Sequence, residues 1–277
     1  MSNNTPASFS PASFSDVLAR ICTRRLLDVQ EQMAACSTAQ MWQKLRDAPQ
    51  QARGFAAALQ AKAGHAVIAE FKRASPSQGV ISATKTPQQQ AGLYALGGAA
   101  ALSVLTEPHF FKGSNEDLQA ARQAVSLPVL RKDFMVHPWQ ILESKLLGSD
   151  AILLILAWLD DHQAQEMEQL AMELGMDVLI ETHSMAEIER AMQLKSPLIG
   201  VNNRNLKTLA VDQQAFTNLA QYIGQGRVII CESGIESPQA AFAMAKAGAD
   251  AFLIGSWLMR EQDPSGALAH MISAIRQ

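Results

Sequence analysis

The chain has 277 residues, 48% of them hydrophobic, and a formal net charge of -3, so it is long enough to bury a large core. Because the sequence has no basic excess, we expect neither a nucleic-acid partner nor binding to an anionic membrane surface. The three widely spaced cysteines, the polar start and the lack of an apolar run of membrane-spanning length indicate a cytoplasmic protein with free thiols.

The N-terminal segment carries the motif PASFS twice, and Ser and Pro at this density are typical of a flexible arm. We therefore predict an arm over residues 1–15 and a single domain over residues 16–277. From Asp16 onward, apolar side chains such as Leu18 and Ile21 recur about every 3.6 residues. One or two helices thus precede the first strand, in a position to cap a barrel.

Beyond these helices the chain alternates between short β-rich runs and longer helical segments, which favours a parallel sheet with helices outside. Eight such units predict an α/β fold, a (β/α)8 TIM barrel with an N-terminal helical extension. A doubly wound open sheet is the alternative, but it usually has fewer strands, and the dinucleotide-binding turn GxGxxG is absent. The predicted strands are Ala66–Phe71, Ala101–Thr106, Pro128–Phe134, Ala151–Leu156, Asp177–Thr182, Leu198–Asn203, Arg227–Ser233 and Ala251–Ser256.

Several predicted strands end in charged or amide side chains, which core strands normally avoid. In a barrel of this kind the active site lies where strands end and βα loops begin. Because side chains alternate along a strand, Glu70 and Lys72 share one face, as do Asn202 and Arg204. Lys132 likewise shares a face with the apolar residue two positions before it. One polar strand end is usually a solvated terminus or a salt bridge, but several at one rim indicate a common site.

The strand ends lie within the segments IAEFKRASPSQGVI, LTEPHFFKGS, PVLRKDFMV, AILLI, VLIETH, IGVNNRNLKT, ESGI and FLIGSWLMR. In this order they resemble motifs of the indole-3-glycerol phosphate synthase family of tryptophan biosynthesis, from about Asp16 to near the C-terminus. The resemblance implies a barrel with a helical extension. It also implies ring closure of 1-(2-carboxyphenylamino)-1-deoxyribulose 5-phosphate, a small phosphorylated substrate, with loss of carbon dioxide and water and without a cofactor.

The resemblance also implies which residues transfer protons. Lys132, at the lysine of the family's KDF motif, would be the general acid, and burial or neighbouring cations would suit it by lowering its pKa toward neutrality. Glu181, at the family's catalytic glutamate, would be the general base. Lys72, held by Glu70, would bind the substrate carboxylate and is a candidate for a second acid. The division of acid roles between the two lysines stays open.

Further positions are implied to bind the substrate. Asn202 and Arg204 match the family's pair near the carboxylate and the reacting centre, and a forked guanidinium suits a planar anion. Phe111 and Phe134 match aromatics that pack on the anthranilate ring, and Ser75 would order the first loop. We expect the phosphate at the last two βα loops, where glycines let the backbone approach closely. The residues there are Ser233, Gly234, Gly255 and Ser256.

Other polar or reactive residues are interpreted as structural. The six histidines show neither HxH nor HExxH spacing, so we predict no metal site, and we expect His183 at most to tune or border the active site. Cys231 in an apolar strand is expected to be a buried thiol, and Arg131 to point away from Lys132 as an ion-pair partner. Trp257 departs from the small residue expected at its position in the family's motif.

Two other functions remain as alternatives. Another phosphate-binding barrel, such as phosphoribosylanthranilate isomerase, would need a Cys and Asp acid–base pair at its strand ends. A non-catalytic barrel that binds a phosphorylated metabolite would show no turnover. Because the chain ends at Gln277, we expect one activity rather than a fusion. We also expect a monomer, with a weak homo-oligomer as the alternative.

Overall fold

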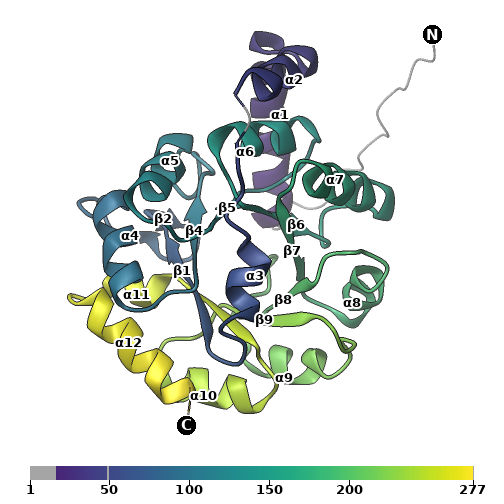
Figure 1. The fold of residues 1–277 in the computed structure, drawn as a ribbon. Helices are drawn as coiled ribbons and strands as arrows, with labels where there is room; N and C mark the ends of the chain where they lie inside the picture. The colour runs from purple at the N-terminus through teal and green to yellow at the C-terminus, as the bar shows by residue number, and fades with distance from the viewer. Residues whose placement is uncertain (1–16, 49, 277) are drawn as a thin grey trace.

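The computed structural model describes residues 17–48 and 50–276, which fold around a closed barrel of parallel strands (Figure 1). The predicted (β/α)8 fold is confirmed, since eight strands of this described part each pair in parallel with two neighbours. The arm predicted over residues 1–15 lies outside the described residues. The barrel strands are β1 (Ala66–Phe71), β4 (Ala101–Leu105), β5 (Val129–Lys132), β6 (Ala151–Ile155), β7 (Asp177–Thr182), β8 (Leu198–Asn202), β9 (Val228–Glu232) and β10 (Ala251–Ile254).

Side chains alternate along each strand between the barrel interior and the surrounding helices. Ile68, Leu130 and Leu179 are completely buried in the cluster that fills the barrel, whereas Val67 and Val129 belong to the cluster between strands and helices. The same alternation carries past the apolar residues to the strand ends. It therefore turns the polar residues two positions further along each strand toward the barrel axis.

A ring of helices surrounds the strands in Figure 1, and side-chain caps start most of them. Ser, Thr or Asp at these N-caps accepts a hydrogen bond from a backbone N–H that the helix itself leaves free. No helix within residues 17–48 and 50–276 has both the length and the apolar character needed to cross a membrane. The helices of the ring are α4 (Pro87–Leu96), α5 (Asn115–Ala124), α6 (Trp139–Leu147), α7 (Asp161–Glu173), α8 (Met185–Ala191), α9 (Gln214–Ala220), α10 (Pro238–Lys246), α11 (Ser256–Arg260) and α12 (Pro264–Ile275).

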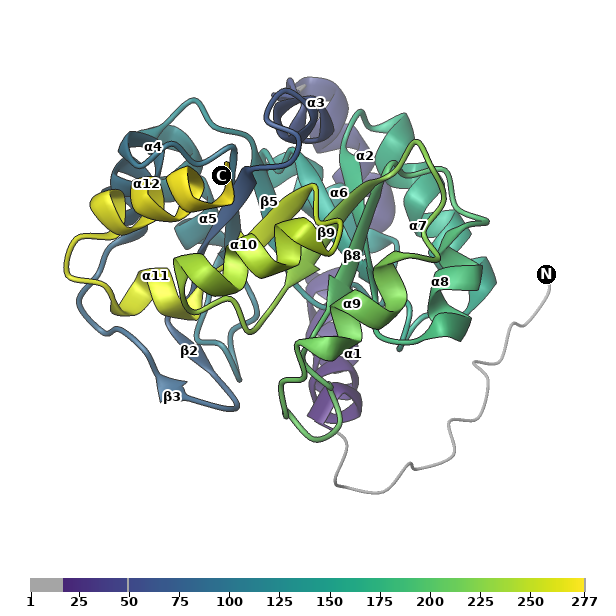
Figure 2. The ribbon, with the colours of Figure 1, turned by 90° about the horizontal axis from the view of Figure 1, so that it is seen from below.

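Three helices in the described part precede β1, where the sequence predicted one or two. They are α1 (Val17–Ala35), α2 (Thr38–Asp47) and α3 (Phe55–Gln60). They are separate helices because Ser37 caps the start of α2, and Gly54, with φ of 71°, precedes the start of α3. Figure 2 shows α3 at the end of the barrel opposite the β2 and β3 hairpin, so the expected cap is α3, while α1 reaches the other end.

Two local features differ from the sequence prediction. The third strand is shorter than Pro128–Phe134, because Asp133 leaves the ladder and pairs with Arg25 of α1 at 2.9 Å. The first βα loop, for which the sequence predicted no strand, contains a small antiparallel hairpin of β2 (Ala74–Ser75) and β3 (Gly79–Val80). Both features add backbone order at the end of the barrel where the polar strand ends meet.

Candidate active site

The carboxyl ends of the strands surround one pocket, and every site residue predicted from the sequence lines it. The residues come from all parts of the chain, from Glu70 on β1 to Ser256 at the start of α11. Apolar side chains of α1, including Leu18 and Ile21, also line this pocket. The N-terminal extension is therefore part of its wall.

Lys132 projects from the end of β5 into a group of carboxylates. Its Nζ lies 2.6 Å from Oε2 of Glu232 and 3.3 Å from Oε2 of Glu181, and its side chain is 14% exposed. Burial opposes the charged form, but the attraction of Glu232, Glu181 and Glu70 outweighs it and raises the pKa of Lys132 above its usual value. The expectation that its surroundings lower this pKa toward neutrality is therefore wrong. Its neighbours are anions rather than cations, so they hold Lys132 in its charged form.

Glu181, from the end of β7, is held on both of its oxygens. Oε1 accepts a hydrogen bond from Nδ2 of Asn202 at 3.0 Å and lies 3.2 Å from Nε2 of His183, while Oε2 faces Lys132. Burial raises the pKa of a carboxyl group, but Lys132 and His183 outweigh it and hold the pKa of Glu181 well below its usual range. Glu181 is therefore an ionised carboxylate beside a charged lysine.

A second pair lies at the end of β1. Nζ of Lys72 is 2.8 Å from Oε1 of Glu70, whose other oxygen accepts a long hydrogen bond from Ser103 at 3.5 Å. Gly255 on the neighbouring strand end is needed here, since a Cβ at this position would stand 2.3 Å from Oε1 of Glu70. The absent side chain leaves room for the carboxylate that positions Lys72.

The walls of the pocket differ in character. Phe111 and Phe134 form an apolar wall, with ring centroids 5.7 Å apart and ring planes inclined by 35°. On the opposite rim, Ser233 and Gly234 take consecutive left-handed conformations, with φ of 64° and 75°. This sharp turn brings their backbone to the pocket beside the start of α11, where Trp257 is partly buried against the core and also lines the pocket.

Arg204 lies at the pocket edge, half-buried. Its backbone N–H donates to Oδ1 of Asn202 at 2.9 Å, and its guanidinium donates to the carbonyl of Leu209, also at 2.9 Å. Ser75 lies across the pocket mouth on the hairpin, with its hydroxyl 3.4 Å from that of Ser77. Both residues thus belong to loops that border the pocket rather than to its floor.

Arg131 points away from the pocket, as the alternation of the strand predicted. Its guanidinium donates to Thr106 and Ser144, and it forms a 2.7 Å ion pair with Glu143 of α6. The same guanidinium meets Asp133, which also accepts two hydrogen bonds from Arg25 of α1. This network ties α1 to the strand that carries the central lysine.

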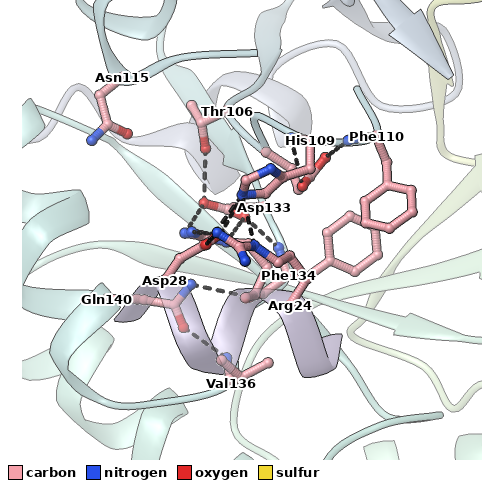
Figure 3. A network of polar contacts seen from close by, with 12 residues as sticks. Arg24, Asp28, Thr106, His109, Phe110, Asn115, Asp133, Phe134, Val136 and Gln140 are labelled. Carbon is pink, nitrogen blue, oxygen red and sulfur yellow. Dashed lines mark hydrogen bonds and ion pairs between the residues drawn. The ribbon is translucent and has the colours of Figure 1, made fainter. Parts of the chain in front are cut away.

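Figure 3 shows how this network continues along the loop after β5. Nε2 of Gln140 donates to the carbonyl of Phe134 at 3.0 Å, and Oε1 of Gln140 accepts from the N–H of Val136 at 2.8 Å. On the other side, Asp28 of α1 lies 3.0 Å from Nε2 of His109. The loop that carries Phe134 of the aromatic wall is therefore held by hydrogen bonds from Gln140.

The chain matches the model of the family described as indole-3-glycerol phosphate synthase over residues 18–271. An indole-3-glycerol phosphate synthase of Azospirillum brasilense is 46% identical over 262 residues, which cover 94% of this chain and 100% of the relative. Another, from Magnetococcus marinus, is 46% identical over 263 residues, covering 93% of this chain and 98% of the relative. The chain belongs to the indole-3-glycerol phosphate synthase family.

Solved structures of other enzymes share the fold. A thiamine phosphate pyrophosphorylase of Pyrococcus furiosus superposes with a TM-score of 0.60 at 12% identity, over 78% of this chain and 98% of that one. The tryptophan synthase alpha subunit of Legionella pneumophila gives 0.58 at 15% identity, over 82% and 99%. At such low identity these likenesses show the barrel alone.

For this member of the indole-3-glycerol phosphate synthase family, the sequence prediction missed one central side chain. Glu232, at the end of β9, is buried, and its Oε1 has no hydrogen-bond partner among the described residues. Burial and repulsion by Glu181 outweigh the attraction of Lys132 and raise the pKa of Glu232 to about 7. Its position two residues after the inward-facing Ile230 was the available signal.

The described residues contain no group of three or more His, Cys, Asp and Glu side chains arranged to hold a metal ion. The two central carboxylates meet the ammonium of Lys132 instead. Cys231 is a free thiol buried on the helix-facing side of β9, and burial raises its pKa to about 12. It lies outside the residues that line the pocket.

Proposed function

We propose that this chain closes the indole ring of indole-3-glycerol phosphate, with Lys132 as general acid and Glu181 as general base. The reaction is that of a carboxy-lyase and releases carbon dioxide and water from 1-(2-carboxyphenylamino)-1-deoxyribulose 5-phosphate. The observation that carries the assignment is the ammonium of Lys132, in contact with Glu181 and Glu232 within one pocket. An acid and a base are thus available side by side.

The proton balance of the reaction explains why such a site is suited to it. The substrate carbonyl oxygen leaves as water, so it must gain two protons. The aromatic carbon loses carbon dioxide and keeps the electron pair, which restores the ring after the new carbon–carbon bond has formed. The methylene carbon beside the nitrogen gives up one proton. Each turnover therefore needs one base and two proton deliveries, with a net uptake of one proton from the medium.

Lys132 delivers the first proton to the carbonyl oxygen as the ring carbon attacks. Its raised pKa keeps it protonated until the oxygen becomes strongly basic in the transition state. Glu232 lies 2.6 Å from Nζ and, with a pKa of about 7, takes up protons near neutral pH. In this proposal Glu232 returns a proton to Lys132 between turnovers.

Glu181 removes the methylene proton through the oxygen that faces Lys132, and Asn202 orients it by the hydrogen bond to the other oxygen. Lys72 binds the substrate carboxylate and is the candidate for the second proton delivery. Glu70 holds the Lys72 ammonium at 2.8 Å from its carboxylate. In this proposal Lys132 acts in ring closure, whereas Glu181 and Lys72 act in dehydration.

The remaining pocket residues bind the two ends of the substrate. Phe111 and Phe134 pack on the anthranilate ring, and Arg204 anchors the carboxylate end. Ser75 orders the hairpin over the substrate. The phosphate binds at the tight turn after β9 and at the start of α11, where backbone N–H groups can be approached closely. These contacts come from Ser233, Gly234, Gly255 and Ser256.

The assignment is tested by adding the anilino-deoxyribulose phosphate to purified protein and following indole fluorescence. We expect turnover far above that of a Lys132→Ala variant. Turnover no greater than that of this variant would identify a non-catalytic binding barrel instead. The isomerase alternative is disfavoured by the position of Cys231, which faces the helices rather than the pocket.

A further inference from the structure

Behind Glu181, a histidine is held between two carboxylates. Nε2 of His183 lies 3.2 Å from Oε1 of Glu181, and Nδ1 lies 3.3 Å from Oε2 of Glu187 on α8. The imidazole does not line the pocket, whereas Glu181 does. It therefore contacts the proposed base from the side that the substrate does not reach.

The start of α8 fixes Glu187 in this place. The hydroxyl of Ser184 accepts from the N–H of Glu187 at 3.3 Å and donates to its Oε1 at 3.0 Å. The other oxygen, Oε2, accepts a hydrogen bond of 2.8 Å from the N–H of His183. Glu187 thus holds His183 by backbone and by side chain, and the imidazole has a fixed direction toward Glu181.

The groups that face the imidazole favour its charged form. Glu181 approaches from β7 and Glu187 from α8, while β8 contributes the neutral amide of Asn202, which shares Oε1 of Glu181 with the ring. Burial lowers the pKa of His183, but the two carboxylates outweigh it and raise this pKa to about 10. His183 is therefore an imidazolium at neutral pH, and its charge contributes to the lowered pKa of Glu181.

We propose that His183, held by Glu187, is a positioning residue whose charge beside Oε1 keeps the Glu181 carboxylate ionised after Lys132 has given up its proton. The inference rests on the proposed role of Glu181 as base. During the reaction Lys132 becomes neutral, and Glu181 then loses one of its two positive partners. The imidazolium does not take part in the proton transfer, so its charge remains and prevents Glu181 from taking a proton before the methylene carbon offers one.

Replacement of His183 by Asn removes this charge and keeps an amide that can donate to Glu181. The pKa of Glu181 then rises, so its ionised fraction falls as the pH falls. We expect the decline of kcat on acidification to lie about one pH unit higher in His183→Asn than in the wild type, which corresponds to about one pKa unit. KM should stay within about twofold, because His183 does not line the pocket. His162→Asn, an exposed change on α7, is the matched control.

Two further measurements separate this role from a structural one. In His183→Gly, added imidazole should shift the acid decline of kcat back to lower pH, because the free imidazolium can occupy the vacated position. In Glu187→Gln, nuclear magnetic resonance of the labelled histidines should show His183 titrating at lower pH than in the wild type, whereas the exposed change Glu189→Gln should leave its titration unchanged.

Glu181→Gln distinguishes the failure of this inference from the failure of the proposed function. If that variant keeps near-normal turnover, Glu181 is not the base, and the proposed role of His183 is overturned as well. If Glu181→Gln is inactive but His183→Asn has the pH profile of the wild type, only the positioning role is overturned. A lack of rescue by imidazole in a folded His183→Gly would also count against the role.

Discussion

Where the strands begin, Asp150 and Asp177 accept hydrogen bonds from backbone N–H groups, whereas at the other end Glu181 and Glu232 contact the ammonium of Lys132. A backbone N–H does not titrate, so the first arrangement can only hold structure. An ammonium between carboxylates can lose and regain a proton. The chemistry of a buried carboxylate in this barrel is therefore set by its partner rather than by its burial.

The packing of the two ends differs in the same way. Helix α3 closes the first end with Phe55 and Leu59, which are fully buried. At the second end glycine leaves room for a carboxylate, since a Cβ at Gly200 would stand 2.2 Å from Oε1 of Glu232. One end is filled with apolar atoms, and the other keeps space for carboxylates and a substrate. Substitutions at the two ends should consequently affect different properties.

The largest effect is expected for Lys132→Met, which removes the acid from the open end. Turnover should fall by about a thousandfold, within the range for loss of a general acid, while substrate binding is spared. Steady-state kinetics followed by indole fluorescence, together with a binding titration, measure the two effects. Lys246→Met, an exposed change on α10, is the control. Near-normal turnover of Lys132→Met would rule out the proposed acid.

A smaller loss is expected for Glu232→Gln, since the acid remains but its proton supply is removed. Glu232 has a pKa of about 7 and works in its protonated form, so wild-type kcat should decline as the pH rises above this value. In Glu232→Gln we expect kcat at pH 6.5 to fall about tenfold to a hundredfold and this decline to disappear. A decline that persists unchanged in the variant would assign it to another group.

Strand alternation made most of the open end predictable from sequence. Glu70, Lys72 and Lys132 could be assigned to the barrel interior because the period of two is a local property of a strand. The outward direction of Arg131 followed from the same rule and is confirmed by its contacts with Glu143 and Asp133. Roles for individual residues came instead from the resemblance to a family.

Features that depend on distant residues were not predictable in this way. Arg25 and Asp133 are 108 residues apart in the chain, and their hydrogen bonds shorten the third strand. The buried position of Glu232 depends on Gly200 in the neighbouring strand, and a terminal Glu is by default solvated. The direction of the pKa shift of Lys132 likewise depends on carboxylates from other strands.

A still smaller effect on catalysis is expected for Arg204→Ala, at the edge of the pocket. Loss of a charged hydrogen bond to a bound anion costs about 1.5–3 kcal/mol, so KM should rise about tenfold to a hundredfold. Turnover at saturation should change little, because the hydrogen bonds of Arg204 go to Asn202 and Leu209 rather than to Glu181. Arg46→Ala, on the exposed side of α2, is the control. Reduced kcat with unchanged KM would contradict an anchoring role.

The least effect on catalysis, and the largest on stability, is expected for Asp150→Asn at the closed end. Asp150 accepts from the N–H groups of Arg53 and Val129 and pairs with Arg122 at 2.8 Å. An asparagine has only one acceptor oxygen, so its NH2 group would face one of these N–H donors. The free energy of unfolding should therefore fall by about 3 kcal/mol. Urea unfolding measures this loss, with the exposed Asp161→Asn as the control.

Turnover of folded Asp150→Asn should match the wild type, because its partners lie at the closed end of the barrel and hold backbone rather than substrate. If Asp150→Asn instead lowers kcat while stability is unchanged, the two ends are coupled through the strands. The separation of a structural end from a catalytic end would then be incorrect. Kinetics below the unfolding transition, compared with Lys132→Met under the same conditions, distinguishes these outcomes.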